Sequence, residues 1–348
     1  MSNKPNVIVT GGTGFIGSHI CIELSEYFEL VIIDNLYNSC LNTVEKIEKL
    51  ISKKVDFYKE DLLNKDKIES IFAKYEPYAV IHLAGLKSVN ESIQKPLCYY
   101  MNNLYSTINL LEVMKKYQCF NLIFSSSATV YGRQSSPLRE NTNIGYGITN
   151  PYGQTKYMIE KILGDICVSD TRWNVISLRY FNPVGAHPSG LIGENPNDIP
   201  NNLLPYILKV SVNNNTDTNL GTNYDRLKIF GNNYLTEDGT CERDFIHIVD
   251  LAKGHLAAIL QLKSFSGYNV FNLGTGKPVS VLKFVNTFTK VNKLKLPYQI
   301  SERRPGDLPV CFCDTSYSEK MLNWKAEKTL SDICIDSWKF QNLNPNGY

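Results

Sequence analysis

The glycine-rich segment TGGTGFIG, at residues 10–17, limits the possible folds of this chain more than any other feature. It comes directly after the short apolar run Asn6–Thr10, which is typical of a buried strand, and it opens a helix-like stretch. Gly11, Gly14 and Gly17 stand three residues apart. A backbone without Cβ atoms can turn tightly and approach a pyrophosphate, and the helix start offers free N–H groups. In this context the motif indicates a dinucleotide site.

Strand-like runs alternate with helix-like stretches through the first half of the chain. The clearest helix-like stretches are His19–Phe28 and Tyr99–Tyr117. Strands that are separated by helices pair in parallel, and the loops after them share one edge of the sheet, where ligands bind. The sequence therefore predicts an α/β fold with a Rossmann-type doubly wound parallel sheet. The expected strands are Asn6–Thr10, Leu30–Asp34, Asp56–Lys59, Tyr78–Leu83, Asn121–Ser125 and Asn174–Arg179.

The composition changes after Asn182, where proline, glycine and asparagine become frequent and interrupt regular structure. We expect a dinucleotide-binding Rossmann domain at residues 1–182. Residues 183–348 are expected to form a smaller, mixed α/β substrate domain, from which some chain returns to the Rossmann sheet. The asparagine-rich stretch Ser211–Tyr224 is predicted to be a surface loop with no part in the chemistry.

The charge balance and the cysteines restrict the class of protein. Lys and Arg number 36 against 34 Asp and Glu, so the net charge is near +2 and no nucleic-acid footprint is indicated. No signal peptide and no apolar stretch of about 18 residues is evident, so no membrane contact is expected. Nine scattered cysteines favour reduced thiols and a cytoplasmic location. Cys311 and Cys313 lack further metal-ligand neighbours, so no metal is predicted.

Asp34 ends the second predicted strand, 17 residues after Gly17. A carboxylate at this place can accept hydrogen bonds from the hydroxyls of an adenosine ribose, and it repels a 2′-phosphate. The position therefore favours NAD over NADP as the cofactor. The competing interpretation is an aspartate that only caps a turn.

Tyr152 and Lys156 form the pattern Tyr-x-x-x-Lys, with Pro151 as a plausible first helical residue. Side chains four residues apart share one face of a helix. A free phenol has a pKa near 10, and a nearby ammonium and the positive nicotinamide of an oxidised cofactor both favour the phenolate. The pair therefore predicts a general base. By itself the spacing is common, and it gains weight from the glycine loop.

Ser127 belongs to the cluster Ser125-Ser126-Ser127, which follows the fifth predicted strand at the same sheet edge. A serine cluster alone is more often a turn or a helix cap. In this architecture, 25 residues before Tyr152, the hydroxyl of Ser127 is placed to bind a sugar hydroxyl. The five histidines show no metal-like spacing, and we expect them to serve packing or hydrogen bonding.

With these pieces in place the chain resembles the extended short-chain dehydrogenase/reductase family, and within it the UDP-sugar 4-epimerases. The resemblance covers nearly the whole chain and rests on ordered matches. They are His82–Lys87 (HLAGLK), Phe124–Gly132 (FSSSATVYG), Leu178–His187 (LRYFNPVGAH), Ile199–Pro205 (IPNNLLP), Thr236–His247 (TEDGTCERDFIH) and Arg303–Pro309 (RRPGDLP).

The resemblance implies roles for the matching positions. Ser127, Tyr152 and Lys156 correspond to the catalytic set. The positions implied for NAD are Gly11, Gly14, Phe15, Ile16, Gly17, Asp34, Asn35, Asp61, Leu62, Leu83, Ala84, Lys87, Asn102, Tyr152, Lys156 and Phe181. The positions implied for the UDP-sugar are Ser127, Tyr152, Asn182, Asn202, Leu203, Phe230, Arg243, Arg304, Asp307 and Cys311. Two arginines suit a diphosphate, because guanidinium groups bind its oxygens in pairs.

The implied activity is interconversion of UDP-glucose and UDP-galactose through a 4-keto sugar, with NAD retained, as part of galactose metabolism. Cys311 corresponds to a position that borders the sugar pocket, where a tyrosine is associated with plain hexoses. Because cysteine is small, the resemblance implies that UDP-N-acetylglucosamine and UDP-N-acetylgalactosamine are also substrates. It further implies a homodimer that pairs through Tyr99–Tyr117 and the helix that carries Tyr152.

Two alternatives remain open on the residues. A nucleotide-sugar dehydratase or decarboxylase of the same family is one, but a dehydratase needs an acid/base pair after the active-site serine, where this chain has Ala128 and Thr129. A regulator that senses NAD without chemistry is the other. Such a protein would have no need of Ser127, Tyr152 and Lys156 together.

Overall fold

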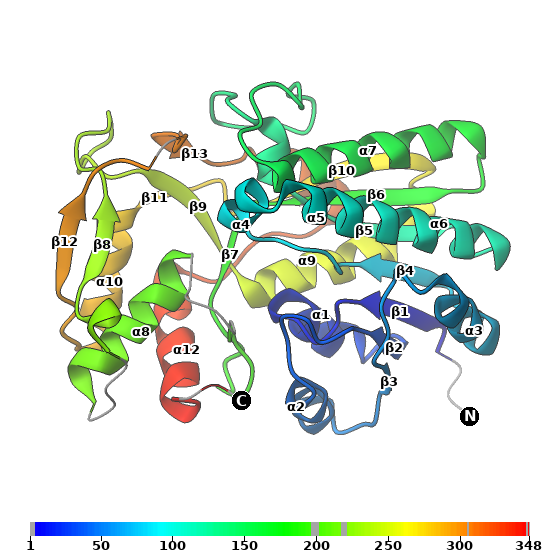
Figure 1. The fold of residues 1–348 in the computed structure, drawn as a ribbon, viewed down its shortest axis with the longest axis horizontal. Coiled ribbons are helices and arrows are strands. Elements are labelled where there is room, and N and C mark those ends of the chain that lie inside the picture. Colours follow the sequence, from blue (N-terminus) through cyan, green and yellow to red (C-terminus); the bar gives the residue numbers. More distant parts are fainter. Residues whose placement is uncertain (1–3, 196–201, 217–220, 305, 346, 348) are drawn as a thin grey trace.

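A parallel sheet of seven strands forms the centre of the molecule (Figure 1). The computed structural model describes residues 4–195, 202–216, 221–304, 306–345 and 347. The strand order is β3-β2-β1-β4-β5-β6-β10, and every neighbouring pair is parallel. This confirms the predicted fold class. The strands are β1 (Asn6–Thr10), β2 (Glu29–Ile33), β3 (Asp56–Tyr58), β4 (Ala79–His82), β5 (Asn121–Ser127), β6 (Asn174–Tyr180) and β10 (Gly267–Leu273).

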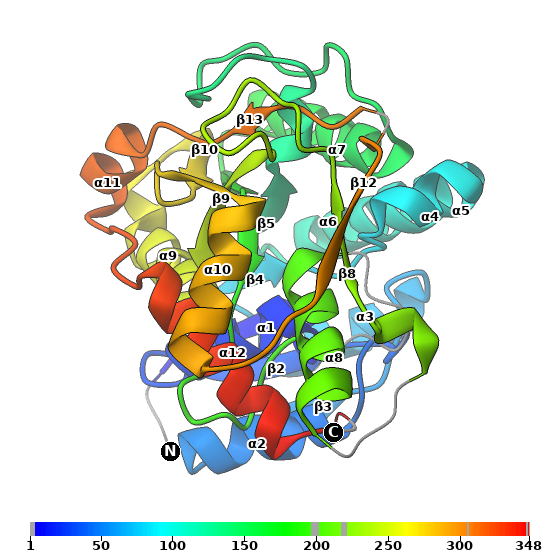
Figure 2. The ribbon, with the colours of Figure 1, turned by 90° about the vertical axis from the view of Figure 1, so that its left-hand side faces the viewer.

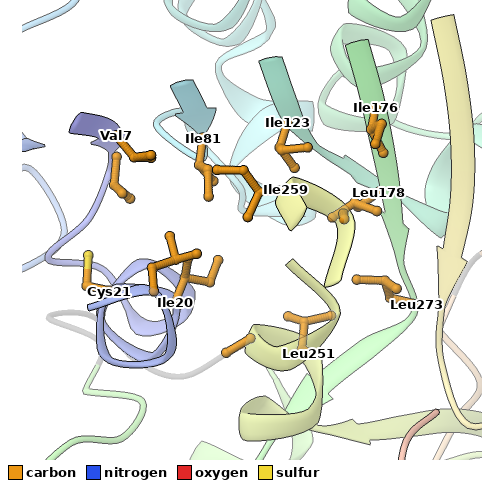
Figure 3. Packing of buried hydrophobic residues seen from close by; sticks show 14 of the residues in the cluster. Val7, Ile20, Cys21, Ile81, Ile123, Ile176, Leu178, Leu251, Ile259 and Leu273 are labelled. Carbon is orange, nitrogen blue, oxygen red and sulfur yellow. The ribbon is translucent and has the colours of Figure 1, made fainter. Parts of the chain in front are cut away.

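Helices cover both faces of this sheet. Consecutive strand residues point to opposite faces, and because both sets are apolar, each face has to be covered. Val7, Ile81 and Ile123 face α1 (Phe15–Leu24) and α9 (Ile248–Gln261), as the close view of the core shows (Figure 3), and α2 (Asn42–Ile51) adds Ile47 to the same core. Ile8 and Leu122 belong to the core of the other face. That second face packs against α3 (Lys65–Tyr75), α6 (Ser106–Lys116) and α7 (Pro151–Ser169).

Two predicted helices differ from the observed ones. The helix expected at His19–Phe28 starts earlier and ends at Leu24, because Phe28 turns into the core just before β2. The single helix expected at Tyr99–Tyr117 is three segments. They are α5 (Pro96–Tyr100), a π-helical turn η1 (Met101–Tyr105) and α6, preceded by the short α4 (Val89–Gln94). Helix α7 begins at Pro151 as predicted, with the side chain of Asn150 accepting a hydrogen bond from the Gly153 amide.

The C-terminal part of the chain builds two smaller sheets. Strand β9 (Glu242–His247) pairs with β7 (Asn182–Val184), β11 (Pro278–Ser280) and β13 (Val310–Cys311), while β8 (Leu227–Phe230) pairs with β12 (Tyr298–Ser301). Helices α8 (Leu203–Asn215), α10 (Val281–Asn292) and α12 (Leu330–Leu343) pack beside them (Figure 2). The remaining helices are α11 (Ser316–Leu322) and the 3-10 turns η2 (Ala128–Tyr131), η3 (Thr222–Tyr224) and η4 (Leu262–Ser264).

The prediction of a loop at Ser211–Tyr224 is wrong for its first five residues, which form the end of α8. Ser211 and Val212 are buried, and the asparagines that suggested a loop bind backbone carbonyl groups instead. The amide of Asn214 donates to the carbonyl of Val210, and that of Asn215 donates to Lys295 at 2.7 Å. The prediction failed because side-chain hydrogen bonds with distant backbone satisfy asparagines that usually favour turns. Residues 217–220 of this stretch lie outside the described residues.

Candidate active site

A cavity of about 340 Å³ lies at the carboxyl ends of β1, β2 and β4. Strand order reverses between β1 and β4, which is where open α/β sheets bind ligands. The lining contains every residue that the sequence analysis assigned to NAD except Phe181, which is buried beside Tyr131. Those lining residues are Gly11, Gly14, Phe15, Ile16, Gly17, Asp34, Asn35, Asp61, Leu62, Leu83, Ala84, Lys87, Asn102, Tyr152 and Lys156.

The glycine loop has the shape that requires glycine. Gly11 has a φ of +72°, which side chains with a Cβ atom rarely adopt. A Cβ atom on Gly17 would lie 2.2 Å from the carbonyl oxygen of Gly11. Gly17 therefore lets helix α1 start directly against the loop, and the first helical turn points at the cavity.

The carboxylate of Asp34 lies just beyond β2 and helps to shape the same loop. Its Oδ2 accepts the amide of Thr13 at 3.1 Å, and its Oδ1 accepts the amide of Leu36 at 2.9 Å and the hydroxyl of Ser39 at 3.1 Å. Asp34 therefore does cap a turn, which was the competing interpretation to ribose binding. Because Asp34 also lines the cavity, the two roles are compatible.

The three predicted catalytic residues meet between β5 and α7. The hydroxyl of Ser127 accepts hydrogen bonds from the amide and hydroxyl of Thr129 at 3.2 and 3.0 Å, so its own proton is free to be donated to the phenol of Tyr152. The ammonium of Lys156 donates to the carbonyl of Ser125 at 2.6 Å. It lies 4.7 Å from the centre of the Phe124 ring and 5.9 Å from that of Tyr152.

Burial dominates the electrostatics of this group. It raises the pKa of Tyr152, and the hydrogen bond from Ser127 opposes that rise. Burial lowers the pKa of Lys156 itself to about 7, against an opposing effect of Glu160.

The residues assigned to the UDP-sugar form two groups on the smaller sheets. Arg243 on β9 donates to the carbonyls of Glu242 and Leu308 at 2.8 Å and lies 3.4 Å from Asp307. In the second group, the guanidinium of Arg304 lies 4.0 Å from the centre of the Phe230 ring.

The remaining positions of this set are dispersed. Cys311 pairs with Arg243 in the strand register, and it packs against the small apolar cluster that contains Tyr131 and Phe181. Asn182 lies on β7, and Leu203 starts α8. Among the described residues that line the cavity, Tyr152 is the only one predicted to contact the sugar nucleotide. Residues 199–201 and 305 of the matching stretches lie outside the described part of the chain.

A scan against protein families matches residues 7–274 to the NAD dependent epimerase/dehydratase family. The chain belongs to that family. It is 48% identical to a UDP-glucose 4-epimerase of Bacillus subtilis over 98% of both chains. It superimposes with a TM-score of 0.92 on a UDP-glucose 4-epimerase of Bifidobacterium longum in complex with NAD+ and UDP, at 46% identity over 99% of this chain and 100% of that one.

A less similar relative is named for two sugar substrates. The UDP-Glc/GlcNAc 4-epimerase of Campylobacter jejuni is 31% identical, with a TM-score of 0.82, over 97% of this chain and 99% of that one. Membership of the family confirms the sequence-based resemblance to UDP-sugar 4-epimerases and the doubly wound fold.

Several residues around the family's cofactor cavity were missed by sequence reasoning. Tyr180, at the end of β6, lines the cavity beside Ser125, and its hydroxyl contacts Nε2 of His255 at 2.5 Å. Strand alternation could have found Ser125, which is two residues before Ser127 on the same strand face. No local pattern distinguishes Tyr180. Glu194 was also missed; it binds Lys87 at 3.4 Å and the amide of Asn202 at 3.3 Å, and so joins a cofactor candidate to a substrate candidate.

The five histidines serve packing or hydrogen bonding, as predicted. His82 bridges the hydroxyls of Thr10 and Thr107, and His247 binds Asp336 at 3.2 Å. Burial lowers the pKa of His19 to about 3, so it stays neutral. Within the described ranges no three potential ligands gather for a metal ion, and no described helix has the length and apolarity to cross a membrane.

Proposed function

We propose that this chain is a UDP-glucose 4-epimerase, which interconverts UDP-glucose and UDP-galactose with a retained NAD. The observation that carries the proposal is the contact of the Tyr152 phenol with Ser127, beside Lys156, at the wall of the glycine-loop cavity. Relatives of 46–49% identity over almost the whole chain bear the same name. The alternative of a regulator that senses NAD without chemistry is not supported, because such a protein would need no catalytic groups at the wall of the cavity.

The residues around the cavity fit NAD. A Cβ atom on Gly11 would lie 2.8 Å from the amide nitrogen of Ala84, so glycine leaves room for close approach to the loop. The amides at the start of α1 suit a pyrophosphate. The carboxylate of Asp34 suits a ribose with free hydroxyls and disfavours a 2′-phosphate. When bound, NAD accepts a hydride from C4 of the sugar and returns it.

The side chains of the protein handle the proton and the orientation of the sugar. Tyr152 as phenolate takes the proton from the sugar O4, and Ser127 holds that oxygen in place. Burial alone raises the pKa of Tyr152, so the phenolate has to be favoured by positive charge, from Lys156 and from the oxidised nicotinamide. The 4-keto sugar then rotates about its diphosphate linkage, and Tyr152 returns the proton to O4 after reduction on the opposite face.

The UDP portion is proposed to bind across the smaller sheets. Arg243 and Arg304 supply the diphosphate contacts, and Phe230 with Asn182, Asn202 and Leu203 surrounds the uracil and ribose. Arg243 already holds Asp307, and Arg304 already lies on Phe230. Binding therefore exchanges these internal contacts for contacts with the nucleotide.

We also propose that the acetamido sugars UDP-N-acetylglucosamine and UDP-N-acetylgalactosamine are substrates. Cys311 is half-buried, and it packs against the same apolar cluster as Ala128, the residue that follows Ser127 in the chain. Its small side chain leaves room for a 2-acetamido group. The Campylobacter jejuni family member, named for UDP-Glc and GlcNAc, supports this substrate class.

A homodimer is proposed from an exposed apolar row on α5, η1 and α6. Leu97, Met101, Tyr105 and Ile108 are 77%, 64%, 50% and 39% exposed, and their spacing of three to four residues puts them on one helical face. Met158 on α7 is also exposed, and α5 and α7 lie side by side (Figure 1). A second copy would cover both helices and form a four-helix contact. A cytoplasmic location remains a prediction from the nine free cysteines.

The test is to incubate the purified protein with UDP-galactose without added NAD and to separate the sugar nucleotides. Formation of UDP-glucose would demonstrate epimerisation and a cofactor retained through purification. If no product forms, the assay is repeated with NAD. Continued absence of product while NAD binds tightly would reject the epimerase and favour the non-catalytic NAD-binding protein.

A further inference from the structure

Three polar side chains on one face of α7 contact three consecutive residues at the end of β5. Tyr152, Lys156 and Glu160 are four residues apart and so share a helix face. Tyr152 meets the hydroxyl of Ser127, and Lys156 donates to the carbonyl of Ser125. Glu160, one turn further, accepts the hydroxyl of Ser126 at 2.5 Å. The end of one strand therefore holds the helix at three successive turns.

The carboxylate of Glu160 is buried and held from two sides. Arg179 on β6 donates to it twice, from Nε at 3.0 Å and from Nη2 at 2.7 Å, while the side chains of both residues are at most 4% exposed. Arg179 stands opposite Ser126 in the strand register. Its Nη1 donates to the hydroxyl of Tyr131 at 3.0 Å and to the carbonyl of Glu140 at 3.2 Å. Neither member of the pair can rotate without losing several of these bonds.

A buried ion pair such as Glu160 with Arg179 contributes little net free energy to the stability of a fold. Removing two charges from water costs more than the pair commonly returns, and apolar residues of similar volume often stabilise as well or better. In this molecule the pair contributes a defined geometry, because a bidentate pair fixes direction as well as distance. The direction that is fixed is the rotation of α7 about its own axis relative to β5.

We propose that Glu160, oriented by Arg179, is a positioning residue that fixes helix α7 on the end of strand β5 and so holds Tyr152 and Lys156 in their working geometry. The inference rests on the proposed function. Without this bond Ser126 and α7 are free to shift, and Ser127 and the Ser125 carbonyl then lose their alignment with their partners.

The charge of Glu160 acts in the same direction. Burial lowers the pKa of Lys156 to about 7, and Glu160 opposes that effect. The other titratable groups that face Lys156 are Tyr152 on its own helix and His82 on β4, which burial keeps neutral. Loss of the Glu160 charge would therefore leave Lys156 less often protonated near neutral pH.

The test compares Ser126→Ala, which removes one hydroxyl, and Glu160→Gln, which removes the charge, with Ser337→Ala. Ser337 is a buried serine of α12 whose hydroxyl, within the described part of the chain, bonds inside its own helix, to the carbonyl of Ile333. We expect both variants near α7 to lose about tenfold to hundredfold in kcat, with KM for UDP-galactose nearly unchanged, because small misplacements of reacting groups cost this much. In Glu160→Gln the loss of activity at high pH should also move to lower pH. Ser337→Ala should match the parent in kcat and pH profile.

A variant that misfolds would mimic the effect, so a stability control is needed. The double variant Glu160→Met with Arg179→Met replaces the pair by apolar side chains and leaves no unpaired buried charge, so we expect it to remain folded. We expect it to be folded and slow. A folded double variant, or Ser126→Ala, that retains the kcat and pH profile of the parent would overturn the proposal.

A second readout separates this inference from the epimerase assignment. Ultraviolet titration of the NAD-loaded protein, minus the same titration of Tyr152→Phe, reports the phenol of Tyr152 whatever the substrate. Ser126→Ala should raise the pKa of that phenol, because it misaligns the donating Ser127. If the parent has no activity on UDP sugars but this shift is present, the proposed function fails and the positioning role stands. An unchanged titration rejects the positioning role.

Discussion

The phenol of Tyr152 carries the proposed proton transfer, and it is also the group whose surroundings are best defined. Replacement by phenylalanine leaves the ring packing intact and removes only the hydroxyl that meets Ser127. We expect Tyr152→Phe to lower kcat by about 10²–10⁴-fold, which is the usual contribution of a general acid/base. NAD should still bind, since the glycine loop is unaffected.

The measurement is the rate of UDP-glucose formation from UDP-galactose, together with the NAD content of the protein. Tyr157→Phe is the matched control, because Tyr157 is on the same helix but lies against Gly145 away from the cavity lining. Near-parental activity in Tyr152→Phe would remove Tyr152 from the mechanism.

Cys311 is the residue on which the substrate range depends. Cys311→Tyr adds a large ring at the apolar cluster against which Ala128 also packs, and it should abolish turnover of the acetamido sugars while UDP-galactose is still converted. Cys311→Ser keeps the volume small and should retain both activities. The two substrates are compared by kcat/KM for each variant. Loss of both activities in the tyrosine variant, or of neither, would contradict the assigned role of Cys311.

The glycine loop and the start of α1 act together as one element. Gly17→Ala places a Cβ atom against the backbone of Gly11 at 2.2 Å, and backbone atoms cannot move aside at low cost. We expect a loss of about 1–3 kcal/mol of unfolding free energy, as for other overpacked sites, and a large drop in bound NAD. Thermal unfolding and the cofactor content of the purified protein measure the two effects.

Gly164→Ala is the control for this change, because it also adds a methyl group to a helical glycine. Among the described residues, the nearest neighbour of a Cβ atom there would be the ring of Tyr268, at 3.9 Å. The control should keep its NAD and be as stable as the parent or slightly more so. Equal behaviour of the two alanine variants would show that the loop tolerates the methyl group.

The exposed apolar row on α5, η1 and α6 allows a direct test of the proposed homodimer. Leu97→Asp puts a charge on the most exposed residue of the apolar row, at its N-terminal end, and should shift the protein from dimer to monomer in light scattering. Leu235→Asp changes a leucine that is 97% exposed far along the chain, and it should leave the oligomeric state unchanged. A monomeric parent, or a Leu97→Asp protein that remains dimeric, would contradict the proposed interface.

In the whole molecule, the cofactor cavity lies on the Rossmann sheet, while most residues predicted for the UDP portion lie on or beside the smaller sheets; β10 and α9 bring later chain back onto the Rossmann sheet. The division at residues 182 and 183 remains a prediction. Because NAD is proposed to bind the folded state, its removal should lower stability. The shift corresponds to about 2.7 kcal/mol when free NAD is about 100 times its Kd.

Thermal unfolding of the protein with and without NAD measures this effect. Gly17→Ala should show little difference between the two conditions, because its loop no longer accepts the pyrophosphate. A parent protein whose unfolding temperature does not respond to NAD would argue against a resident dinucleotide at this cavity.

Short-range patterns determined much of this protein. The glycine spacing, the buried strand runs and the Tyr-x-x-x-Lys pair are each encoded within a few residues, so the sequence alone predicted most of the sheet, the glycine loop and part of the lining of its cavity. The same short range explains the errors. Asparagines at the end of α8 indicated a loop because their partners, such as the carbonyl of Lys295, lie far along the chain.

Tertiary structure alone decided which distant side chains meet. Tyr180 contacts His255, and Glu160 forms an ion pair with Arg179. Glu194 binds both Lys87 and Asn202. Nothing in the spacing of these residues along the chain marks them as partners. Tertiary structure also decided that burial has the largest effect on the pKa of Tyr152. Burial and pairing depend on which strands and helices pack together, and that is a property of the folded chain and not of any local run of residues.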